Sequence, residues 1–308
     1  MPDISKINAL DIGSVSKVDG LAKASILDID GVAVPAGSVN VPPLDTYTGA
    51  AAAYSVRLLR TAHSGDCMRV RRDSDNVEAD IGFDSNNEFG LTSPVSNPSS
   101  GGPFTDFADF IGHGGPPANG FVRWWYDQSG NAVDAGQATS TSQPQIYSAA
   151  TGIIEEGAAG KEKPALAKNS GGSGVLSTSA VSGLTTISMF DVATTGGFNR
   201  IAQLGNVIHA GDFMYQGTVL SFTSTNNAQA LTSLFFKATD EAYINGSQVA
   251  SGNAGTASAG SGVIGGQSAT LRVIDYMQEF IFYDFDQTSP TNNRPGIETN
   301  LNNYFLIF

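Results

Sequence analysis

The sequence is poor in cysteine, in charge and in long apolar runs, and each shortage excludes a class of protein. Cys67 is the only cysteine among 308 residues, so no internal disulfide can form and no oxidising compartment is implied. We expect its thiol to be a small buried hydrophobic group. No stretch reaches the roughly 18 apolar residues that a membrane-spanning helix needs. We therefore expect no insertion into a membrane.

Basic residues are scarce as well, and the N-terminus carries no leader pattern. The formal net charge is −13, which would repel a phosphate backbone, so we expect no nucleic-acid partner. The first residues, "MPDISKINAL", lack a basic region followed by an apolar run, which argues against a signal peptide. A chain without a leader that acts outside a cell leaves it by lysis or by a leaderless route. Acidity also keeps a crowded, multi-copy protein soluble.

What the sequence does contain is much glycine and many short apolar runs. Only 15% of the residues are charged, and there are 36 glycines and 13 prolines. Serine, threonine and asparagine are frequent, and long helical periodicity is missing. These features are typical of short strands joined by turns. A chain of this length buries roughly three quarters of its unfolded surface, so a sizeable core is expected.

The first 34 residues repeat one pattern three times with a period of eleven. Each unit has a β-branched run, then Asn-Ala or Asp-Gly, then a second apolar run, which predicts a hairpin. An eleven-residue period is also typical of a right-handed helical supercoil, but glycine and β-branched residues disfavour that helix. The repeated apolar positions are Ile4, Ile7, Leu10, Val15, Val18, Leu21, Ile26, Ile29 and Val32.

We interpret residues 1–36 as a docking or oligomerisation segment. Ile4 and Ile7 are three apart, so both faces of a ribbon carry apolar groups and need a cover. A ribbon of this size is marginal alone in water. The partners expected are other copies of the chain, as a homotrimer by analogy with fibres, and other proteins of an assembly. The alternative is a sheet extension packed on the main domain. Residues 37–45 are interpreted as a linker and 46–308 as the main domain.

The main domain is predicted to be a two-sheet antiparallel β-sandwich with a few short helices. We expect a helix over 46–62, a β-turn at 73–76 between two alternating runs, and a short helix over 105–111 with Thr105 as its N-cap. Asn245-Gly246 predicts a two-residue hairpin turn. The last strand is expected to hold three aromatics, and a final helix begins at Pro295. These aromatics are Phe280, Phe282 and Phe285.

The stretch "FVRWWYDQSGNAVDAGQ" at 121–137 is the main candidate for ligand binding. An aromatic strand runs into a polar, glycine-containing loop, where the aromatics could stack a sugar ring and the carboxylates could bind its hydroxyls. The alternative is that the tryptophans fill a sandwich core and that Asp127 braces the loop through backbone N–H groups. The candidate glycan-binding residues are Trp124, Trp125, Asp127, Gln128 and Asp134.

Two blocks of the main domain resemble a known family. "AAAYSVRLLRTAHSGDCMRVRRDSDNVEADIGF" and "WWYDQSGNAVDAGQ" resemble the catalytic domains of fungal α-L-arabinofuranosidase B. "AYINGSQV", "VIGG" and "LRVIDYMQEFIFYD" resemble concanavalin A-like, laminin G-type sandwiches. The same combination, preceded by repeats of the "SKINGV" type, is typical of structural proteins of tailed bacteriophages. The resemblance implies a jelly-roll sandwich.

The resemblance also implies where a glycosidase would carry its two carboxyl groups, and this chain departs from it at both places. The acid is expected in a Gly-Gly-Asp stretch, where this sequence has Gln267, which cannot donate and regain a proton. The nucleophile is expected as a glutamate on a central strand. The corresponding segment, 199–222, contains Asp212 as its only carboxylate. We therefore expect no enzymatic activity.

No other catalytic or metal-binding pattern is present in the sequence. His63, His113 and His209 are far apart and lack metal-ligand spacing, so we expect each in a loop or at the surface. We expect no cofactor and no metal. The preferred interpretation is a bacteriophage virion component, a fibre, decoration or adhesin protein that displays the jelly roll and attaches to host-surface polysaccharide. The alternatives are a stand-alone lectin and a glycoside hydrolase with displaced carboxylates.

Overall fold

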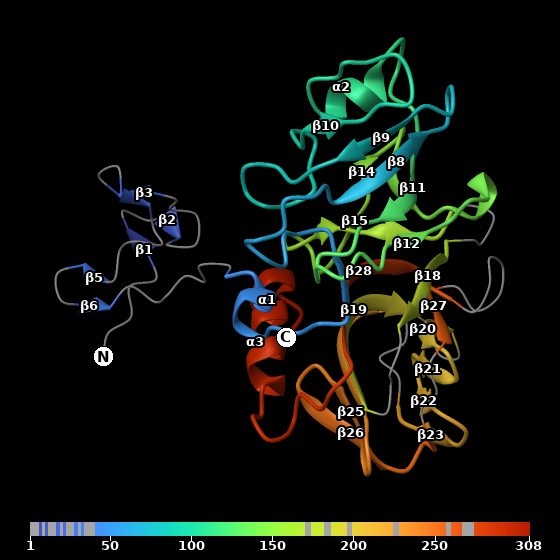
Figure 1. Cartoon of the computed structure of the whole chain (residues 1–308). Helices are drawn as coiled ribbons and strands as arrows, with labels where there is room; N and C mark the ends of the chain where they lie inside the picture. The colour runs from blue at the N-terminus through green and yellow to red at the C-terminus, as the bar shows by residue number, and fades with distance from the viewer. Residues whose placement is uncertain are drawn as a thin grey trace. The chain divides into compact units, whose positions relative to one another are not determined.

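The chain forms two compact units, Met1–Val41 and Pro42–Phe308, in a computed structural model (Figure 1). In the larger unit the structure describes residues 42–169, 174–181, 186–195, 199–223, 228–256, 260–266 and 274–308. In the smaller unit it describes six two-residue strands. The larger unit begins at Pro42, inside the segment 37–45 that was expected to be a linker. Leu44 of this segment is buried in the core of the larger unit.

The three repeats of the smaller unit form three separate two-stranded antiparallel ribbons. These are β1 (Lys6–Ile7) with β2 (Leu10–Asp11), β3 (Lys17–Val18) with β4 (Leu21–Ala22), and β5 (Asp28–Ile29) with β6 (Val32–Ala33). The apolar repeat positions face each other in one register, as Ile7↔Leu10, Val18↔Leu21 and Ile29↔Val32. The prediction of strands rather than a helical supercoil is confirmed. Ile4, Val15 and Ile26 lie outside the described residues.

The larger unit is a mainly β, antiparallel sandwich, as the sequence predicts. One layer is β26 (Ser247–Gly252), β25 (Asp240–Ile244), β24 (Ala228–Phe236), β19 (Ile187–Thr195), β28 (Tyr276–Tyr283) and, along the far edge of β28, β7 (Ala52–Ser55) and β17 (Leu166–Ala167). The other layer runs from β23 (Val219–Ser221) through β22 (Phe213–Tyr215), β21 (Val207–Ala210), β20 (Arg200–Leu204), β27 (Gly260–Ile264), β18 (Leu176–Val181) and β12 (Ala135–Gly136) to β11 (Gly120–Trp125).

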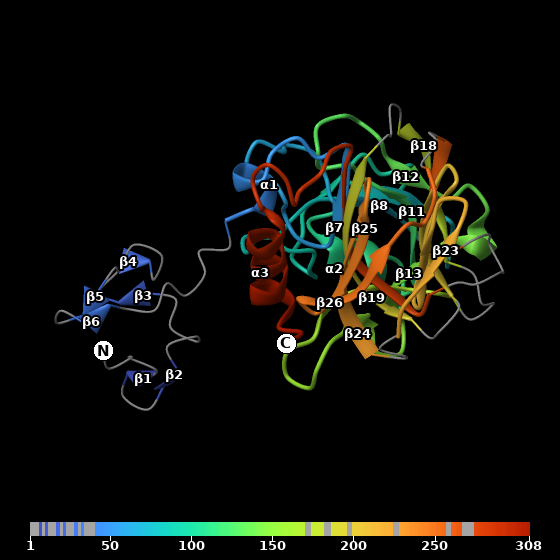
Figure 2. The same cartoon turned by 90° about the horizontal axis from the view of Figure 1, so that it is seen from below.

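Further strands extend this second layer and join the two layers. β11 continues into β8 (Met68–Arg72), β9 (Glu78–Ile81) and β10 (Val95–Ser96). β13 (Gln145–Ser148) pairs with β11, with β14 (Gly152–Ile153) and with β17, so the sheet closes on itself. β15 (Glu155–Glu156) and β16 (Lys163–Pro164) form a separate two-stranded antiparallel sheet. Seen from below, β24 and β26 face β18 and β23 across the core (Figure 2).

The described residues of the larger unit also form three α-helices and one 3-10 turn, η3 (Ser140–Ser142). They are α1 (Pro43–Thr46), α2 (Phe107–Gly112) and α3 (Arg294–Phe305), and α3 packs against α1 and β24. The final helix is confirmed, with Ile297, Leu301, Tyr304 and Phe305 buried. The helix expected over 46–62 is wrong. Ala52–Ser55 form β7, because pairing with β28 buries all four side chains and overrides the helical propensity of the alanines.

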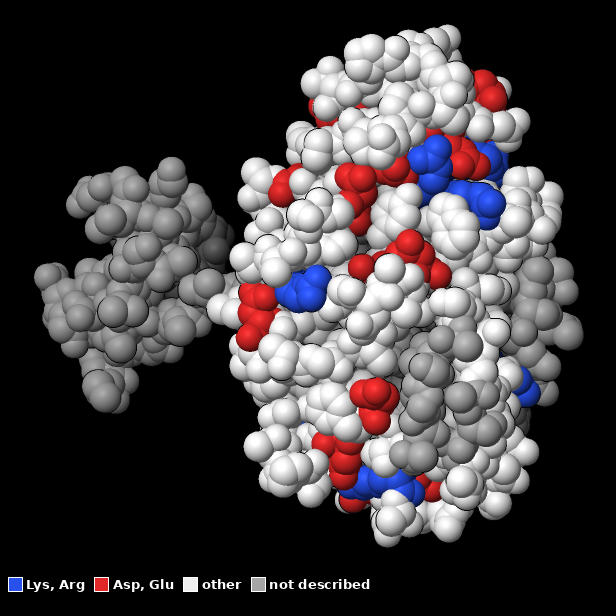
Figure 3. Space-filling model, in the orientation of Figure 1, with Lys and Arg blue, Asp and Glu red and all other residues white. Residues whose placement is uncertain are grey.

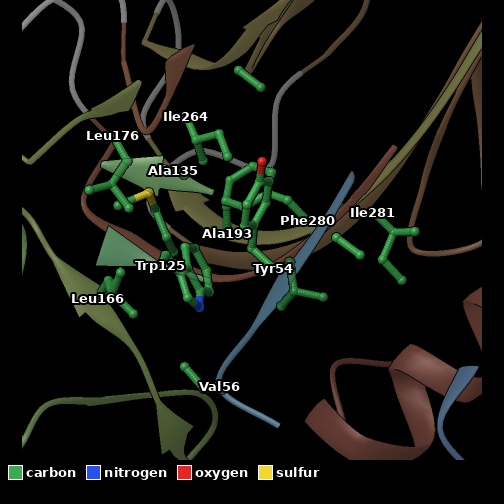
Figure 4. Packing of buried hydrophobic residues seen from close by; sticks show 14 of the residues in the cluster. Tyr54, Val56, Trp125, Ala135, Leu166, Leu176, Ala193, Ile264, Phe280 and Ile281 are labelled. Atoms are coloured by element: carbon green, nitrogen blue, oxygen red, sulfur yellow. The ribbon is translucent and has the colours of Figure 1, made fainter. Parts of the chain in front are cut away.

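The core lies between the two layers, and β7 of the first layer contributes to it. Trp125 of β11, Tyr54 of β7 and Phe280 of β28 converge there (Figure 4). The Trp125 ring centroid lies 5.9 Å from that of Tyr54 and 6.2 Å from that of Phe280. All three side chains are buried. The Trp125 indole N–H donates to the Ser55 carbonyl at 3.2 Å, so the buried polar atom is satisfied.

The turn predictions are confirmed, and two local details are corrected. β8 and β9 flank the 73–76 turn, and Asn245 and Gly246 both have positive φ between β25 and β26. α2 is confirmed, but Asp106 rather than Thr105 is its N-cap, because the Asp106 carboxylate accepts from the Asp109 N–H. Phe285 lies beyond the end of β28 and is 40% exposed.

Candidate functional site

A β-bulge in β11 decides which tryptophan faces outward. Val122 lies opposite Val70, whereas Trp124 lies opposite Arg69, so Arg123 is one residue too many on its strand. Val122 and Trp125 are therefore buried, and Arg123 and Trp124 are both half-buried on the outer face. In strict alternation Trp124 would share the face of Val122. The bulge thus presents an indole on the outer surface of the sheet.

The indole of Trp124 lies across a glycine on the neighbouring strand. Trp124, Gly136 and Ser177 are in register on β11, β12 and β18. A Cβ at Gly136 would lie 2.2 Å from Cζ3 of Trp124, so only glycine leaves room for the ring there. The Arg123 guanidinium carbon lies 5.2 Å from the Trp124 ring centroid. Gly136 and Arg123 therefore fix the orientation of the indole.

A groove of about 670 Å³ opens beside this indole, and we call it the Trp124 groove. Ser177 and Ser179, two apart on β18, expose their hydroxyls along it. Gln137 is held in place, because its Nε2 donates to the Val175 carbonyl at 3.1 Å. The groove is lined by Arg123, Trp124, Ala132, Asp134, Gly136, Gln137, Ala138, Ser177, Thr178 and Ser179.

A second hollow of about 340 Å³ adjoins the first, and we call it the His63 pocket. It shares Ala132 and Asp134 with the Trp124 groove. Within it the Tyr126 hydroxyl donates to Asp80 Oδ1 at 2.6 Å. The pocket is lined by His63, Gly65, Asp66, Tyr126, Asp127, Gly130, Ala132 and Asp134.

Two carboxyl groups of the His63 pocket resist ionisation. Burial raises the pKa of Asp66, and the nearby Asp80 carboxylate raises it further. Burial also raises the pKa of Asp134, although the hydrogen bond from the Asp127 N–H, 2.9 Å long, opposes the rise. Desolvation is the larger effect in both cases. The hollow is therefore acidic and partly shielded from water.

A chain of paired charges connects the two hollows along β8, β9 and β11. Arg123 Nε lies 3.8 Å from Glu78, and Arg69 contacts Glu78 at 2.9 Å and Asp80 at 2.8 Å. Asp80 accepts in turn from Tyr126. Figure 3 shows basic and acidic side chains side by side over these strands. The network holds Arg123 in the groove and Tyr126 in the pocket.

The structure separates the five residues that the sequence proposed as one site. Trp124 and Asp134 line the same groove. Trp125 belongs to the core, and the buried Gln128 side chain accepts from the Leu59 N–H and donates to the Arg57 carbonyl. Asp127 is 5% exposed, and its oxygens accept from the N–H groups of Ala53 on β7 and of Ser129 and Val133 in its own loop. The contacts of Trp125 and Asp127 are those that the structural alternative describes, and Gln128 is likewise bonded to the backbone.

Other residues of the two hollows were not singled out from the sequence. They are Arg123, Gln137 and Ser177–Ser179 in the groove, and His63, Asp66 and Tyr126 in the pocket. β18 is about fifty residues from β11 in sequence, so only the sheet order brings the serines to the indole. Tyr126 directly follows the two tryptophans in sequence, and this adjacency was the one feature that could have identified it as a site residue.

The expectation for His209 is wrong. It is fully buried on β21, and its Nδ1 lies 3.1 Å from Asp191 Oδ2 on β19, so the pair bridges the two layers. Cys67 is buried as expected, and burial raises the pKa of its thiol. Asp212 lies in the bend between β21 and β22, and Gln267 lies outside the described residues.

Among the residues that the structure describes, no group of three or more histidine, cysteine or acidic side chains is arranged to hold a metal ion. In the same part of the chain, no helix is both long and apolar enough to cross a membrane.

Comparison with known proteins shows a fold likeness and no family. No family model matches the chain, and no curated protein matches it. A solved arabinofuranosidase in complex with arabinofuranosyl-α-1,2-xylobiose is 13% identical, with a TM-score of 0.53, over 85% of this chain and 64% of that one. A GH54 α-L-arabinofuranosidase soaked with a cyclic sulfate inhibitor is 14% identical, with a TM-score of 0.54, over 85% and 65%. The chain thus spans less than two thirds of either enzyme, and at this identity the likeness shows the fold alone.

Proposed function

We propose that the larger unit is a non-catalytic carbohydrate-binding sandwich and that the Trp124 groove is its binding site. The observation that carries the proposal is the indole of Trp124, which lies over Gly136 and lines the groove together with Asp134, Ser177 and Ser179. An aromatic face supports the apolar face of a sugar ring, and oxygen-rich side chains bind its hydroxyls. The volume of about 670 Å³ is within the usual range of ligand sites.

Replacing Trp124 by alanine is expected to weaken glycan binding by about 30-fold or more, because a truncated anchor tryptophan costs at least about 2 kcal/mol. Binding is measured on a neutral glycan array and then by titration of the best ligand. The chain has two tryptophans, and Trp125 is buried, so fluorescence changes on titration report Trp124. Val249→Ala on β26, at the opposite end of the larger unit in Figure 1, is the matched control. Equal affinities of the W124A variant and the parent chain would overturn the proposal.

The proposal includes a role for residues 1–36 in assembly, as part of a bacteriophage virion. Three ribbons of identical register in a unit separate from the sandwich support it. Each ribbon is too small to be stable alone, so copies from several chains are expected to cover one another. The outward-facing groove then serves attachment to host-surface polysaccharide.

Light scattering tests the assembly role. The full chain is expected to form an oligomer, and a chain that starts at Ser38 is expected to be a folded monomer, because it lacks all three ribbons. Near-ultraviolet circular dichroism serves as the control for a native sandwich, since both tryptophans lie in the larger unit. Two monomers of equal stability would contradict this part of the proposal.

A non-catalytic role is favoured by the sequence of 199–222, where Asp212 is the only carboxylate in the segment that corresponds to the glycosidase nucleophile region. Release of reducing sugar from arabinose-containing or other neutral polysaccharides would overturn this part of the proposal. Such release, lost in an Asp212→Asn variant and kept in a Val249→Ala variant, would favour a hydrolase with displaced carboxylates.

A further inference from the structure

The Trp124 groove does not end at Asp134. Ala132 and Asp134 line both the groove and the His63 pocket, so the two hollows share one wall. Each hollow, at about 670 and 340 Å³, reaches the lower range of a small-molecule site. A ligand that occupies both must pass over Asp134. It must therefore be longer than one sugar ring stacked on Trp124.

The charges along this path select against acidic ligands. Asp66, Asp127 and Asp134 line the His63 pocket, and none of its lining residues is lysine or arginine. Arg123 in the groove is already engaged with Glu78. Burial already raises the pKa values of Asp66 and Asp134, so the pocket disfavours negative charge, and a uronic or sialic carboxylate there would add to an unfavourable acidic cluster. Hydroxyl groups, in contrast, donate hydrogen bonds to carboxylates.

The walls of both hollows are fixed before any ligand binds. Arg69 holds Glu78 and Asp80, and these hold Arg123 on the groove side and Tyr126 on the pocket side. Asp134 is held by the Asp127 N–H. A preorganised path loses little side-chain entropy when a ligand binds. The second hollow is therefore a built continuation of the first.

We infer that the site takes neutral oligosaccharides of at least two units, with one unit on Trp124 and the next in the His63 pocket beside Tyr126 and His63. This inference rests on the proposed function of the Trp124 groove. Asp134 lies between the two subsites and contacts both units. The length and the neutrality of the glycan are thus set by the same short segment of chain.

The test compares mono-, di- and tetrasaccharides of glucose, mannose, galactose and arabinose, with galacturonate oligomers as the anionic counterpart, using the full chain. We expect disaccharides of the recognised sugar to bind about tenfold tighter than its monosaccharide, and tetrasaccharides little tighter than disaccharides. Galacturonate oligomers are expected to bind at least about tenfold more weakly than the galactose series. His63→Ala and Tyr126→Phe are expected to lower the disaccharide-to-monosaccharide affinity ratio about fivefold. Val249→Ala keeps the ratio.

The outcomes distinguish the two proposals. If no neutral sugar of any length binds, the proposed function fails and this inference falls with it. If monosaccharides bind in a Trp124-dependent manner but longer ones bind no tighter, the proposed function stands and the second subsite is wrong. A ratio unchanged in both the His63→Ala and Tyr126→Phe variants, or tighter binding of the galacturonate series, likewise overturns the inference.

Discussion

Replacing Arg57 by methionine is expected to lower the free energy of unfolding by about 3–5 kcal/mol, because it leaves a buried carboxylate without its partner. Arg57 Nε and Nη2 contact Glu279 Oε2 and Oε1 at 2.8 and 3.0 Å, in a two-pronged pair. Both side chains are almost fully buried, at 2% and 0% exposure. Ser55 adds one hydrogen bond to Glu279 at 2.8 Å. Methionine would fill most of the volume and supply none of these bonds.

The same arginine also holds the C-terminal helix on the sheet. Its Nη2 donates to Asn300 Oδ1 of α3 at 3.0 Å, and its guanidinium carbon lies 4.6 Å from the ring centroid of Tyr304. The ion pair with Glu279 of β28 therefore couples α3 to the strand that pairs with β7. Loss of Arg57 is therefore expected to weaken the packing of α3 on the sheet, in addition to leaving the Glu279 carboxylate without its partner.

Urea unfolding followed by tryptophan fluorescence measures this effect, since Trp124 and Trp125 both report the larger unit. The double variant Arg57→Met/Glu279→Leu is the control. It removes both charges, and we expect it to recover most of the lost stability, because a well-packed apolar pair often equals a buried ion pair. A single R57M variant that loses less than about 1 kcal/mol would contradict the prediction.

Local signals in the sequence were sufficient to predict two turns and the final helix. Asn245-Gly246 predicted a hairpin because both residues accept positive φ, the 73–76 cluster predicted a turn from its Asp, Ser and Asn residues, and both are confirmed. The final helix followed from Pro295 and its apolar stripe. The wrong helix over 46–62 has the opposite cause. Alanine is a good helix former, and only pairing with β28, more than 200 residues away, makes 52–55 a strand.

For the candidate site, the sequence indicated a segment and not the geometry. Residues of the segment 121–137 line both hollows, and their role in ligand binding stays a prediction. The bulge at Arg123 was not visible in the sequence, and it alone decides that Trp124 faces outward while Trp125 enters the core. Ser177 and Ser179 reach the groove through strand order, which no local pattern encodes.

Replacing Asp127 by alanine is expected to cost about 2–4 kcal/mol of folding free energy, because one buried carboxylate satisfies four donors. Its Oδ1 accepts from the N–H groups of Ala53 and Ser129 at 2.8 and 2.9 Å. Its Oδ2 accepts from the Ser129 hydroxyl at 2.7 Å and the Val133 N–H at 3.1 Å. Alanine leaves these backbone donors in a loop where little water reaches them.

A graded pair of variants separates this brace from a direct role in ligand binding. Asp127→Asn keeps one acceptor oxygen for Ala53 and Ser129 and loses the bonds at Oδ2, so its loss of stability is expected to be about half that of Asp127→Ala. Glycan affinity should fall in the same order, since the loop that Asp127 holds carries Ala132 and Asp134, the wall shared by both hollows. Thermal unfolding and glycan titration of the three chains measure both quantities. Stability lost without any loss of affinity would mean that this wall forms without Asp127.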